Sequence, residues 1–306
     1  MEELITIITP VYNRAHLIRK LYNSLNTQKK QNFCWMIIDD GSTDEIRTIV
    51  QSFMKSACFH IIFYQKENGG KHTALNLAFS NLSTELAVIV DCDDFLLEDA
   101  TDIIEKKWHE YRSGNVAGMI FLKGYETGEC VGKSELSDGV YDMIKTMFTH
   151  HIEGDKAEVF RCDILRLLRF PEFSGEKFMG EGYLWNQIYL KYEMIYSNQI
   201  IYICNYLEGG LTAQGRKLRI ACPLGGMEYS KICFDKRFPI RERVKRAWLY
   251  VCYGKFARIR FKELVQSSGA PMLIKLNYIF GVVIYVYWKF RYSIKEDRLH
   301  IMENKK

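Results

Sequence analysis

Four short apolar runs in the first hundred residues each end in a polar cluster, and each cluster is followed by a segment of helical character. The runs are rich in β-branched residues and cover residues 4–9, 33–38, 60–64 and 88–90. The helical segments cover residues 15–26, 43–54, 73–82 and 98–111. Strands that alternate with helices of this length are typical of right-handed βαβ units. The sequence therefore predicts an α/β fold with a Rossmann-like, mainly parallel sheet flanked by helices.

The fourth run ends in the most informative cluster, Asp91-Cys92-Asp93-Asp94. Because strands buried on both faces read as continuous Val and Ile runs, these carboxylates should lie just beyond the carboxyl end of the strand. Carboxylates this close repel one another unless a cation holds them. Hard oxygen ligands suit Mg²⁺ or Mn²⁺, which also bridge to phosphate oxygens. The cluster indicates a metal and phosphate site, and the alternative is a solvated acidic turn that caps the next helix.

The other three clusters should lie at the same edge, because ligands of open α/β sheets bind outside the carboxyl ends of the strands. The first cluster offers Thr9 and Tyr12 to line a base pocket and Arg14 to offset phosphate charge. The second offers Asp40 as an acceptor for a uracil N–H or a ribose hydroxyl. The third offers Lys71, a cation that follows two glycines. Each cluster alone could be a turn or a loop, and their joint placement predicts a nucleotide site.

In this order and spacing the clusters resemble the motifs of the family-2 inverting glycosyltransferases with the A-type (GT-A) nucleotide-sugar-binding fold. The resemblance is specific over about residues 4–100 and looser to about residue 215. It implies a metal-dependent, inverting transfer of a sugar from a UDP-sugar donor. The acceptor would be a hydroxyl of a glycan or a lipid-linked glycan, in bacterial surface polysaccharide synthesis. The motifs are Thr9-Pro10-Val11-Tyr12-Asn13-Arg14, Asp39-Asp40-Gly41-Ser42-Thr43-Asp44, Asn68-Gly69-Gly70-Lys71-His72-Thr73-Ala74-Leu75-Asn76 and Asp91-Cys92-Asp93-Asp94.

The resemblance also implies roles for individual residues. Asp40 would contact the uridine, Asp91 the ribose or the waters of the metal, and Asp93 the divalent ion, Mn²⁺ or Mg²⁺, that bridges the diphosphate. The ion and Lys71 would stabilise the departing UDP. Asp94 would be a supporting or capping residue. The implied donor-binding set is Thr9, Pro10, Tyr12, Arg14, Asp40, Lys71, Asp91, Cys92 and Asp93, with Asp91 and Asp93 as metal ligands.

Inverting transfer needs one further carboxylate as a base, and the candidate is Glu181 at the start of a predicted helix. The family commonly has Glu-Asp at such a helix start, whereas this chain has Glu181-Gly182. Glu176 and Asp155 are the other candidates for the base. A simpler interpretation of Glu181 is a first-turn glutamate favoured by the helix dipole.

A Gly-rich segment over residues 208–212 precedes Arg216 and Lys217. Glycines allow a loop to close over a donor, and the two cations could then meet phosphate. The segment is therefore a candidate lid, and a plain hinge is the alternative.

The last part of the chain differs from the rest in charge. Residues 236–306 carry 17 Lys and Arg against 5 Asp and Glu, a net charge of +12, whereas residues 1–235 carry −7. The chain is also long for a single nucleotide-binding domain. We therefore expect a GT-A catalytic domain over residues 1–220 and a basic helical C-terminal extension over residues 221–306.

The extension contains an apolar stretch between two cations. Thirteen uncharged residues, 276–288, separate Lys275 from Lys289, which is too few for a membrane span but typical of an interfacial helix. We expect this part to contact an anionic membrane surface. The alternatives are a homo-oligomer contact and packing on the catalytic domain. No nucleic-acid-binding motif accompanies the charge, so nucleic acid is not an expected partner.

The chain enters its first predicted strand at once, and its nine cysteines contain no C-x-x-C pair. Both features favour a cytoplasmic protein, with peripheral attachment to the inner face of the cell membrane as an option. Reduced core cysteines such as Cys34, Cys58 and Cys204 are expected.

Three functions remain open from the sequence. The first is a metal-dependent UDP-sugar glycosyltransferase. The second is a sugar-phosphate nucleotidyltransferase, which would share the sheet and the acidic residues. Such an enzyme would need a Gly-rich loop bearing Arg or Lys after the first strand, where this chain has Pro10-Val11-Tyr12-Asn13-Arg14. The third is a catalytically impaired sugar-nucleotide-binding subunit, which Gly182 in place of a second acid would fit.

Overall fold

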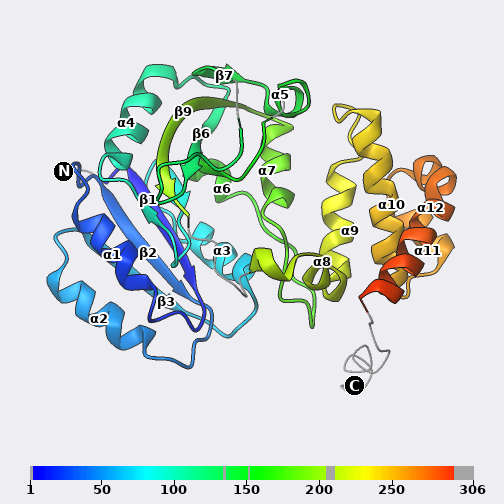
Figure 1. Ribbon diagram of the computed structural model, residues 1–306, viewed down its shortest axis with the longest axis horizontal. Helices are drawn as coiled ribbons and strands as arrows, with labels where there is room; N and C mark the ends of the chain where they lie inside the picture. Colours follow the sequence, from blue (N-terminus) through cyan, green and yellow to red (C-terminus); the bar gives the residue numbers. More distant parts are fainter. Residues whose placement is uncertain (1–2, 134–135, 151, 205–210, 293–306) are drawn as a thin grey trace. The chain divides into compact units, whose positions relative to one another are not determined.

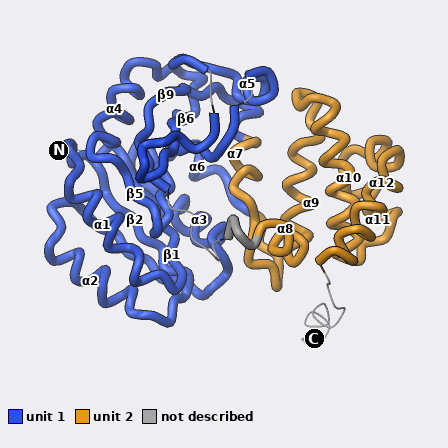
Figure 2. Tube along the Cα trace, viewed as in Figure 1, with its two compact units in different colours: residues 1–170, 188–206 blue, residues 171–187, 207–306 orange. Residues whose placement is uncertain are grey.

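The computed structural model describes residues 3–133, 136–150, 152–204 and 211–292 (Figure 1). The chain forms two compact units (Figure 2), of which the first comprises residues 1–170 and 188–206 and the second comprises residues 171–187 and 207–306. The division passes through helix α7. The expected functional boundary near residue 220 stays a prediction, because compactness does not say which residues act in catalysis.

The first unit is built on a sheet with nine strands among the described residues. Their order is β3-β2-β1-β4-β8-β6-β9-β5, and β7 pairs with β9. The strands are β1 Ile5–Val11, β2 Phe33–Asp39, β3 His60–Gln65, β4 Leu86–Ile89, β5 Phe95–Leu96, β6 Val116–Gly124, β7 Gly139–Tyr141, β8 Lys156–Arg161 and β9 Glu193–Ile203.

Strand directions place several strand ends at one edge. The first four strands are parallel, as predicted. β8 is antiparallel to both β4 and β6, and β9 is parallel to β6. Since β8 alone reverses between β4 and β6, the strands β4, β6 and β9 point the same way. Their carboxyl ends therefore share an edge with those of β1, β2 and β3.

Helices cover both faces of this sheet. β1 and β2 are buried at every residue, which explains their unbroken apolar sequences. Ile7 and Trp35 belong to the core on the face covered by α1, α2 and α4, and α3 packs on β1 and β2 from the other face. The four predicted strand and helix repeats are thus confirmed. The helices are α1 Ile18–Asn26, α2 Ile46–Ser56, α3 Lys71–Ser80, α4 Ala100–Tyr111, α5 Met143–Thr149 and α6 Cys162–Leu165.

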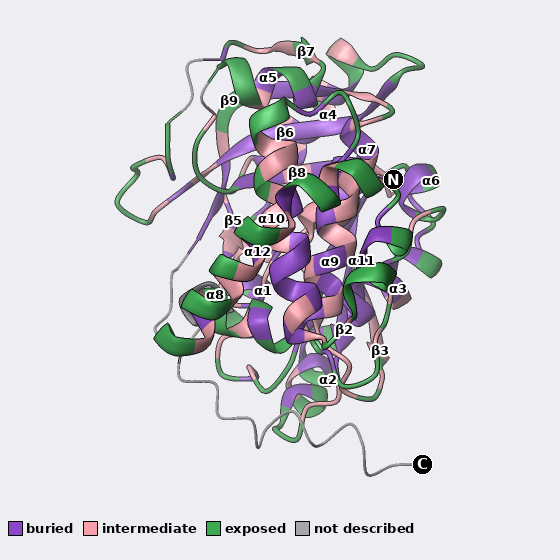
Figure 3. Ribbon diagram, turned by 90° about the vertical axis from the view of Figure 1, so that its right-hand side faces the viewer, coloured by how far each residue is buried: buried purple, intermediate pink, exposed green. Residues whose placement is uncertain are grey.

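The second unit is helical, as predicted for the end of the chain, and Figure 3 colours its buried and exposed residues. Tyr250, Val251, Ile274 and Trp288 are among the buried residues of its core. Its helices are α8 Leu211–Ala221, α9 Pro223–Ile232, α10 Ile240–Phe256, α11 Phe261–Ser267 and α12 Pro271–Arg291, and α7 Gly182–Tyr189 begins in this unit.

All nine cysteines are free thiols, and seven of them are buried. Cys34 and Cys204 lie in the core, as expected. The expectation for Cys58 was wrong, because this residue lies in the exposed connection between α2 and β3 rather than in a strand.

Candidate functional site

The polar clusters of the first three strands meet at one edge of the sheet. Val11 pairs with Asp39, and Asp39 pairs with Gln65, so the last residues of β1, β2 and β3 lie side by side. The chain leaves β4 through Val90, whose N–H donates to the carbonyl of Ile8 in β1 at 2.9 Å. The acidic cluster follows directly, so all four predicted clusters lie at this edge.

Hydrogen bonds join the loops after β1 and β2. Asn13 has a left-handed backbone with a φ of 50°. Its N–H donates to Ser42 Oγ at 2.9 Å, and its Oδ1 accepts from the N–H of Thr43 at 2.8 Å. The N–H of Ala15 donates to Asp44 Oδ2 at 2.8 Å. The two motifs identified in the sequence therefore form one connected rim.

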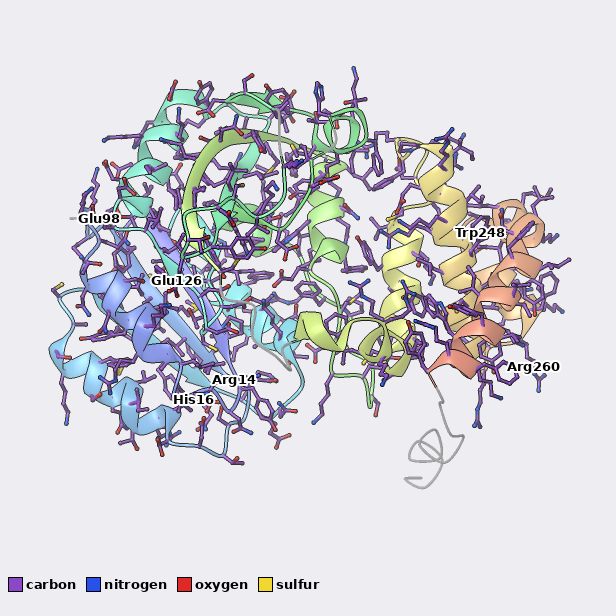
Figure 4. All side chains as sticks on the ribbon, viewed as in Figure 1. Arg14, His16, Glu98, Glu126, Trp248 and Arg260 are labelled. Carbon is purple, nitrogen blue, oxygen red and sulfur yellow. The ribbon has the colours of Figure 1, made fainter. Side chains whose placement is uncertain are left out.

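The donor-binding candidates of the first motif divide into two pairs. Thr9 is fully buried, and its hydroxyl accepts from the indole N–H of Trp35 at 2.9 Å, while Pro10 is also buried. Tyr12 is exposed, and Arg14, which Figure 4 labels, is half-buried. The charge of Arg14 acts to lower the pKa of Asp93 in the acidic cluster. Tyr12 and Arg14 thus present side chains at the edge, whereas the side chains of Thr9 and Pro10 belong to the core.

Asp40 fixes the loop between β3 and α3. Its Oδ1 accepts from Lys66 Nζ at 2.8 Å and from the N–H of Gly69 at 3.0 Å. Its Oδ2 accepts from Asn68 Nδ2 at 3.0 Å and from the N–H of Gly70 at 2.7 Å. Four donors fill the acceptor capacity of one carboxylate. This buried side chain therefore holds the whole loop in place.

Gly41 allows the turn after Asp40 to approach the same loop. Its φ is 78°, and a Cβ at this position would lie 2.7 Å from the backbone nitrogen of Asn68. Only glycine tolerates both the left-handed backbone and this close approach. Lys66, the partner of Asp40, was missed in the sequence because it precedes the glycine motif and directly follows the last residue of β3.

Lys71 forms an ion pair with Asp91. It is the first residue of α3, and its Nζ lies 2.5 Å from Oδ1 of Asp91. Burial alone would raise the pKa of Asp91, but the positive charges of Lys71 and Lys123 outweigh burial and hold this pKa below its usual value. The structure therefore brings together two residues that the sequence placed 20 positions apart and keeps Asp91 ionised.

Asp93 has the opposite electrostatic environment. Burial, and then the charge of Asp91, raise the pKa of Asp93. The Cys92 thiol between them is buried, and burial with the two neighbouring carboxylates raises its pKa, so it stays protonated. A divalent cation would relieve the repulsion between Asp91 and Asp93.

The chemistry of these two carboxylates fits Mg²⁺ or Mn²⁺, which prefer oxygen ligands. No group of three or more metal-binding side chains occurs among the described residues, so a cage made by the protein alone is not present there. Ions of this type commonly take one or two carboxylates and fill the remaining positions with water and phosphate oxygens. Asp91 and Asp93 supply that number of ligands.

Lys123, Tyr202 and Asp94 complete the site, and the first two were missed in the sequence. Tyr202 Oη donates to Asp94 Oδ2 at 2.6 Å and accepts from the N–H of Asp91 at 3.1 Å. Lys123 Nζ lies 4.1 Å from the centre of the Tyr202 ring. Burial, Asp91 and Asp94 raise the pKa of Tyr202, so it remains a donor. Asp94 therefore supports the turn, in agreement with the sequence.

The candidate base, Glu181, belongs to the second unit, directly before α7. Its carbonyl accepts from the N–H of Leu184 at 2.9 Å. The neighbouring Gly182 packs against Tyr229, because a Cβ on Gly182 would lie 2.8 Å from the Tyr229 hydroxyl oxygen. Any side chain here would meet that ring. The departure from the Glu-Asp pattern thus coincides with a packing contact inside the second unit.

Glu176 serves as a helix cap. Its Oε1 accepts from the N–H of Leu224 at 2.8 Å and its Oε2 from the N–H of Gly225 at 2.9 Å, at the start of α9. Burial raises the pKa of Glu176 despite these two bonds. Both carboxylate oxygens are thus engaged in structure.

Asp155 lies at the edge of the sheet in the first unit. It is exposed and directly precedes β8. Because β8 is antiparallel to β4 and β6, its amino end lies at the same edge as their carboxyl ends. Asp155 is therefore a carboxylate on the same edge as Asp91 and Asp93.

The lid candidates belong to the second unit. Residues 208–210 lie outside the described residues. Arg216 and Lys217 are exposed on α8, and the Arg216 guanidinium lies 4.9 Å from the centre of the Trp288 ring. Their proposed contact with phosphate stays a prediction.

Comparison with known families gives an assignment for the first unit. The model of the family "Glycosyl transferase family 2" matches residues 6–171. The chain is 28% identical over 224 residues to "Glycosyltransferase GlyA" of Streptococcus pneumoniae, with 69% of this chain and 32% of GlyA covered. It is 25% identical over 299 residues to "GalNAc(5)-diNAcBac-PP-undecaprenol beta-1,3-glucosyltransferase" of Campylobacter jejuni, with 89% of each chain covered. The match thus spans about a third of GlyA and most of the second relative.

Solved structures share the fold. S. aureus TarS 1–349 in complex with UDP-GlcNAc has a TM-score of 0.59 at 17% identity, with 90% of this chain and 89% of that chain covered. The mannosyltransferase PcManGT from Pyrobaculum calidifontis, in complex with GDP-Man and Mn²⁺, has a TM-score of 0.57 at 16% identity, with 94% and 88% covered. At this identity the likeness establishes the GT-A fold and no more.

Proposed function

Because the chain belongs to glycosyl transferase family 2, we propose that it moves a sugar from a UDP-sugar to a hydroxyl of a glycan or lipid-linked glycan, with inversion and with a divalent cation. The observation that carries this proposal is the cluster of Asp91, Asp93, Lys71 and Lys123 at the carboxyl edge of the sheet. The two carboxylates can bind the cation, and the two ammonium groups can offset the negative charge of the diphosphate, so the site needs both kinds of residue.

The donor would lie along this edge of the first unit. Tyr12 and Arg14 offer an exposed ring and a cation for the nucleotide, and Asp40 shapes the uridine site through the loop that it holds. Lys71 and Lys123 would stabilise the negative charge that develops on the departing UDP. Binding of UDP and UDP-GlcNAc by S. aureus TarS supports a UDP-sugar as the donor.

Asp91 and Asp93 would hold the cation, Mn²⁺ or Mg²⁺. When bound, the ion supplies Lewis-acid neutralisation of the diphosphate. The fit of the two carboxylates supports this, as does the Mn²⁺ in the PcManGT complex. Asp94 and Tyr202 would keep the turn that carries both ligands in place, since Tyr202 contacts the backbone of Asp91 and the side chain of Asp94.

We assign the role of base to Glu181, which would take the proton of the acceptor hydroxyl as it attacks the sugar. Asp155 is the alternative base, and Glu176 is less suited because both of its oxygens hold α9. The name of the Campylobacter jejuni relative specifies an undecaprenol-linked substrate, which supports a lipid-linked acceptor here. Such an acceptor would be used at the cytoplasmic face of a membrane, in bacterial surface polysaccharide synthesis.

The alternative function is a sugar-nucleotide-binding subunit without turnover, which Gly182 beside Glu181 favours. The family assignment gives no support to a sugar-phosphate nucleotidyltransferase. Release of UDP from a panel of UDP-sugars with Mn²⁺ separates turnover from binding. We expect one UDP-sugar to be turned over. If a UDP-sugar binds but no UDP is released with any donor and any candidate acceptor, the result would instead favour the binding subunit.

Two variants identify the base. Glu181→Gln should leave UDP binding unchanged and lower turnover by about 100-fold or more, because it removes the proton acceptor but keeps the side-chain volume. Asp155→Asn is the matched control and should retain turnover. The reverse result would move the role of base to Asp155.

A further inference from the structure

Helix α12 presents an apolar stripe to the surface of the second unit. Eight large apolar side chains of this helix are between 44% and 80% exposed. Their spacing of three or four residues places them on one helical face. The residues of this stripe are Met272, Leu276, Ile279, Phe280, Val283, Val286, Tyr287 and Phe290.

The opposite face of α12 is fixed to α10 inside the same unit. Asn277 Oδ1 accepts from the indole N–H of Trp248 (labelled in Figure 4) at 2.7 Å. Gly281 lies so close to α10 that a Cβ there would be 2.5 Å from Cβ of Val251. Ile274 and Trp288 are buried in the core that the two helices share. The inner face of α12 is therefore already packed on α10, and the stripe is the outer face of the helix.

The packing on α10 argues against α12 as a membrane span. Among the described residues, α12 is the one helix long and apolar enough to cross a membrane by length and composition. Only 17% of its most apolar window is buried. To cross, it would have to leave α10 or take into the bilayer a helix that carries six charged residues from Arg241 to Lys255. The uncharged stretch 276–288 is also only about 20 Å long, against a hydrocarbon core of about 30 Å.

The charge around the stripe selects its partner. Residues 240–292 carry 11 Lys and Arg against 2 Asp and Glu, a net charge of +9. On the helical wheel, Lys275 and Arg291 flank the stripe on its two sides, and both are exposed. A second copy of the chain would bring an equal positive charge to the contact, whereas an anionic bilayer supplies the opposite charge and an apolar interior.

We propose that the α12 stripe binds the surface of an anionic phospholipid bilayer, with α12 parallel to the membrane plane and its apolar side chains at the acyl boundary. Lys275 and Arg291 would lie at the level of the lipid phosphates. This inference goes beyond the proposed sugar transfer, because the stripe belongs to the second unit and uses no residue of the donor site. Membrane binding could therefore hold if the proposed reaction were wrong, and the reverse is also true.

Vesicle flotation of the full chain tests the proposal, with phosphatidylcholine vesicles compared with vesicles containing phosphatidylglycerol. We expect the chain to float with the anionic vesicles and to do so less at 0.5 M salt, a concentration at which the Debye length falls to about 4 Å. Leu276→Gln/Ile279→Gln should lower the partition coefficient by about 10-fold or more. The matched control is Met54→Gln/Leu167→Gln, which changes two exposed apolar residues of the first unit and should float like the wild type.

Each result decides the proposal. Failure of the wild type to float, or flotation of the Leu276→Gln/Ile279→Gln variant at the wild-type level, would overturn it. So would a wild-type dimer in analytical ultracentrifugation that this variant converts to monomer, because the stripe would then bind a second copy. The circular dichroism spectrum and melting temperature of both variants should match the wild type, which shows that the protein is folded without relying on the proposed reaction.

Discussion

The ammonium of Lys71 lies 2.5 Å from a carboxylate oxygen of Asp91, although one begins a helix after β3 and the other follows β4. The positive charge of Lys71 offsets the negative charge of Asp91, which is one of the two carboxylates that we propose as metal ligands. In the proposed complex the same lysine would also stand beside the diphosphate that this cation holds.

We predict that Lys71→Met makes the protein more dependent on a divalent cation. The pair is partly exposed, so the free energy of unfolding without metal should fall by only about 1 kcal/mol. Addition of Mn²⁺ should then raise the melting temperature of the variant more than that of the wild type. Lys106→Met, which removes a lysine from an exposed ion pair with Asp102, is the control for thermal-shift measurements. An equal response to Mn²⁺ in wild type and Lys71→Met would contradict the compensating role.

Asp40→Asn should disorganise the loop between β3 and α3. The carboxylate of Asp40 accepts four hydrogen bonds, whereas the Asn side chain would turn an NH₂ group toward some of those donors. The lost hydrogen bonds should lower the free energy of unfolding by about 2–3 kcal/mol. UDP affinity should fall as well. Glu67→Gln removes the same charge from an exposed residue of the same loop and serves as the control in urea unfolding. A wild-type stability for Asp40→Asn would show that the loop does not depend on this side chain.

Much of this site was predictable from the sequence, because parallel strands bring their carboxyl ends together. That rule located Asp91, Asp93 and Lys71 correctly at one edge. It did not locate Lys123 and Tyr202, because they follow from the direction of β8, which reverses between β4 and β6. The order and direction of strands in the second half of the sheet depend on tertiary contacts, and the local hydrophobic pattern of the sequence does not predict them.

The residues around Asp40 show a different limit. The sequence indicated a carboxylate poised for a ligand, whereas the structure uses all of its acceptor capacity in the protein. Lys66, which is one of the four donors, directly follows β3 and has no motif of its own. A residue type can be predicted to reach a site, but how its hydrogen bonds are distributed depends on the loop that folds around it.

Gly182 and Tyr229 should be energetically coupled. A Cβ on Gly182 would lie 2.8 Å from the Tyr229 hydroxyl oxygen, so Gly182→Ala should lower the free energy of unfolding by about 1–3 kcal/mol. In a Tyr229→Ala background the same change should cost less than half as much. Gly180→Ala is the control, because nothing lies within 4 Å of a Cβ there. Additive costs in the double variant would contradict the contact.

Glu176 should make the second unit more stable as pH falls towards the ordinary range of a glutamate. Burial raises its pKa in the folded state, so the folded chain binds this proton more tightly than the unfolded chain. Its contribution is therefore fully present below the unfolded pKa and is lost as pH rises through the folded pKa. Urea unfolding of wild type and Glu176→Gln at pH 7 and pH 4.5 measures it, because other carboxylates cancel in the difference.

The difference in stability should move in favour of the wild type at the lower pH. A shift in favour of Glu176→Gln would mean that the two N–H donors of α9 outweigh burial and that the carboxylate is a stabilising anion.

Isothermal titration calorimetry of UDP with Mn²⁺ and with EDTA tests whether Asp91 and Asp93 hold a cation, in wild type, Asp93→Ala and the exposed control Glu98→Ala. We predict that Mn²⁺ strengthens UDP binding by about 10-fold or more in wild type and control, an effect of about 1.4 kcal/mol or more. Asp93→Ala should bind weakly and equally in both conditions. Wild-type binding of UDP that is the same in Mn²⁺ and in EDTA would contradict the claim that Asp91 and Asp93 hold a cation against the diphosphate.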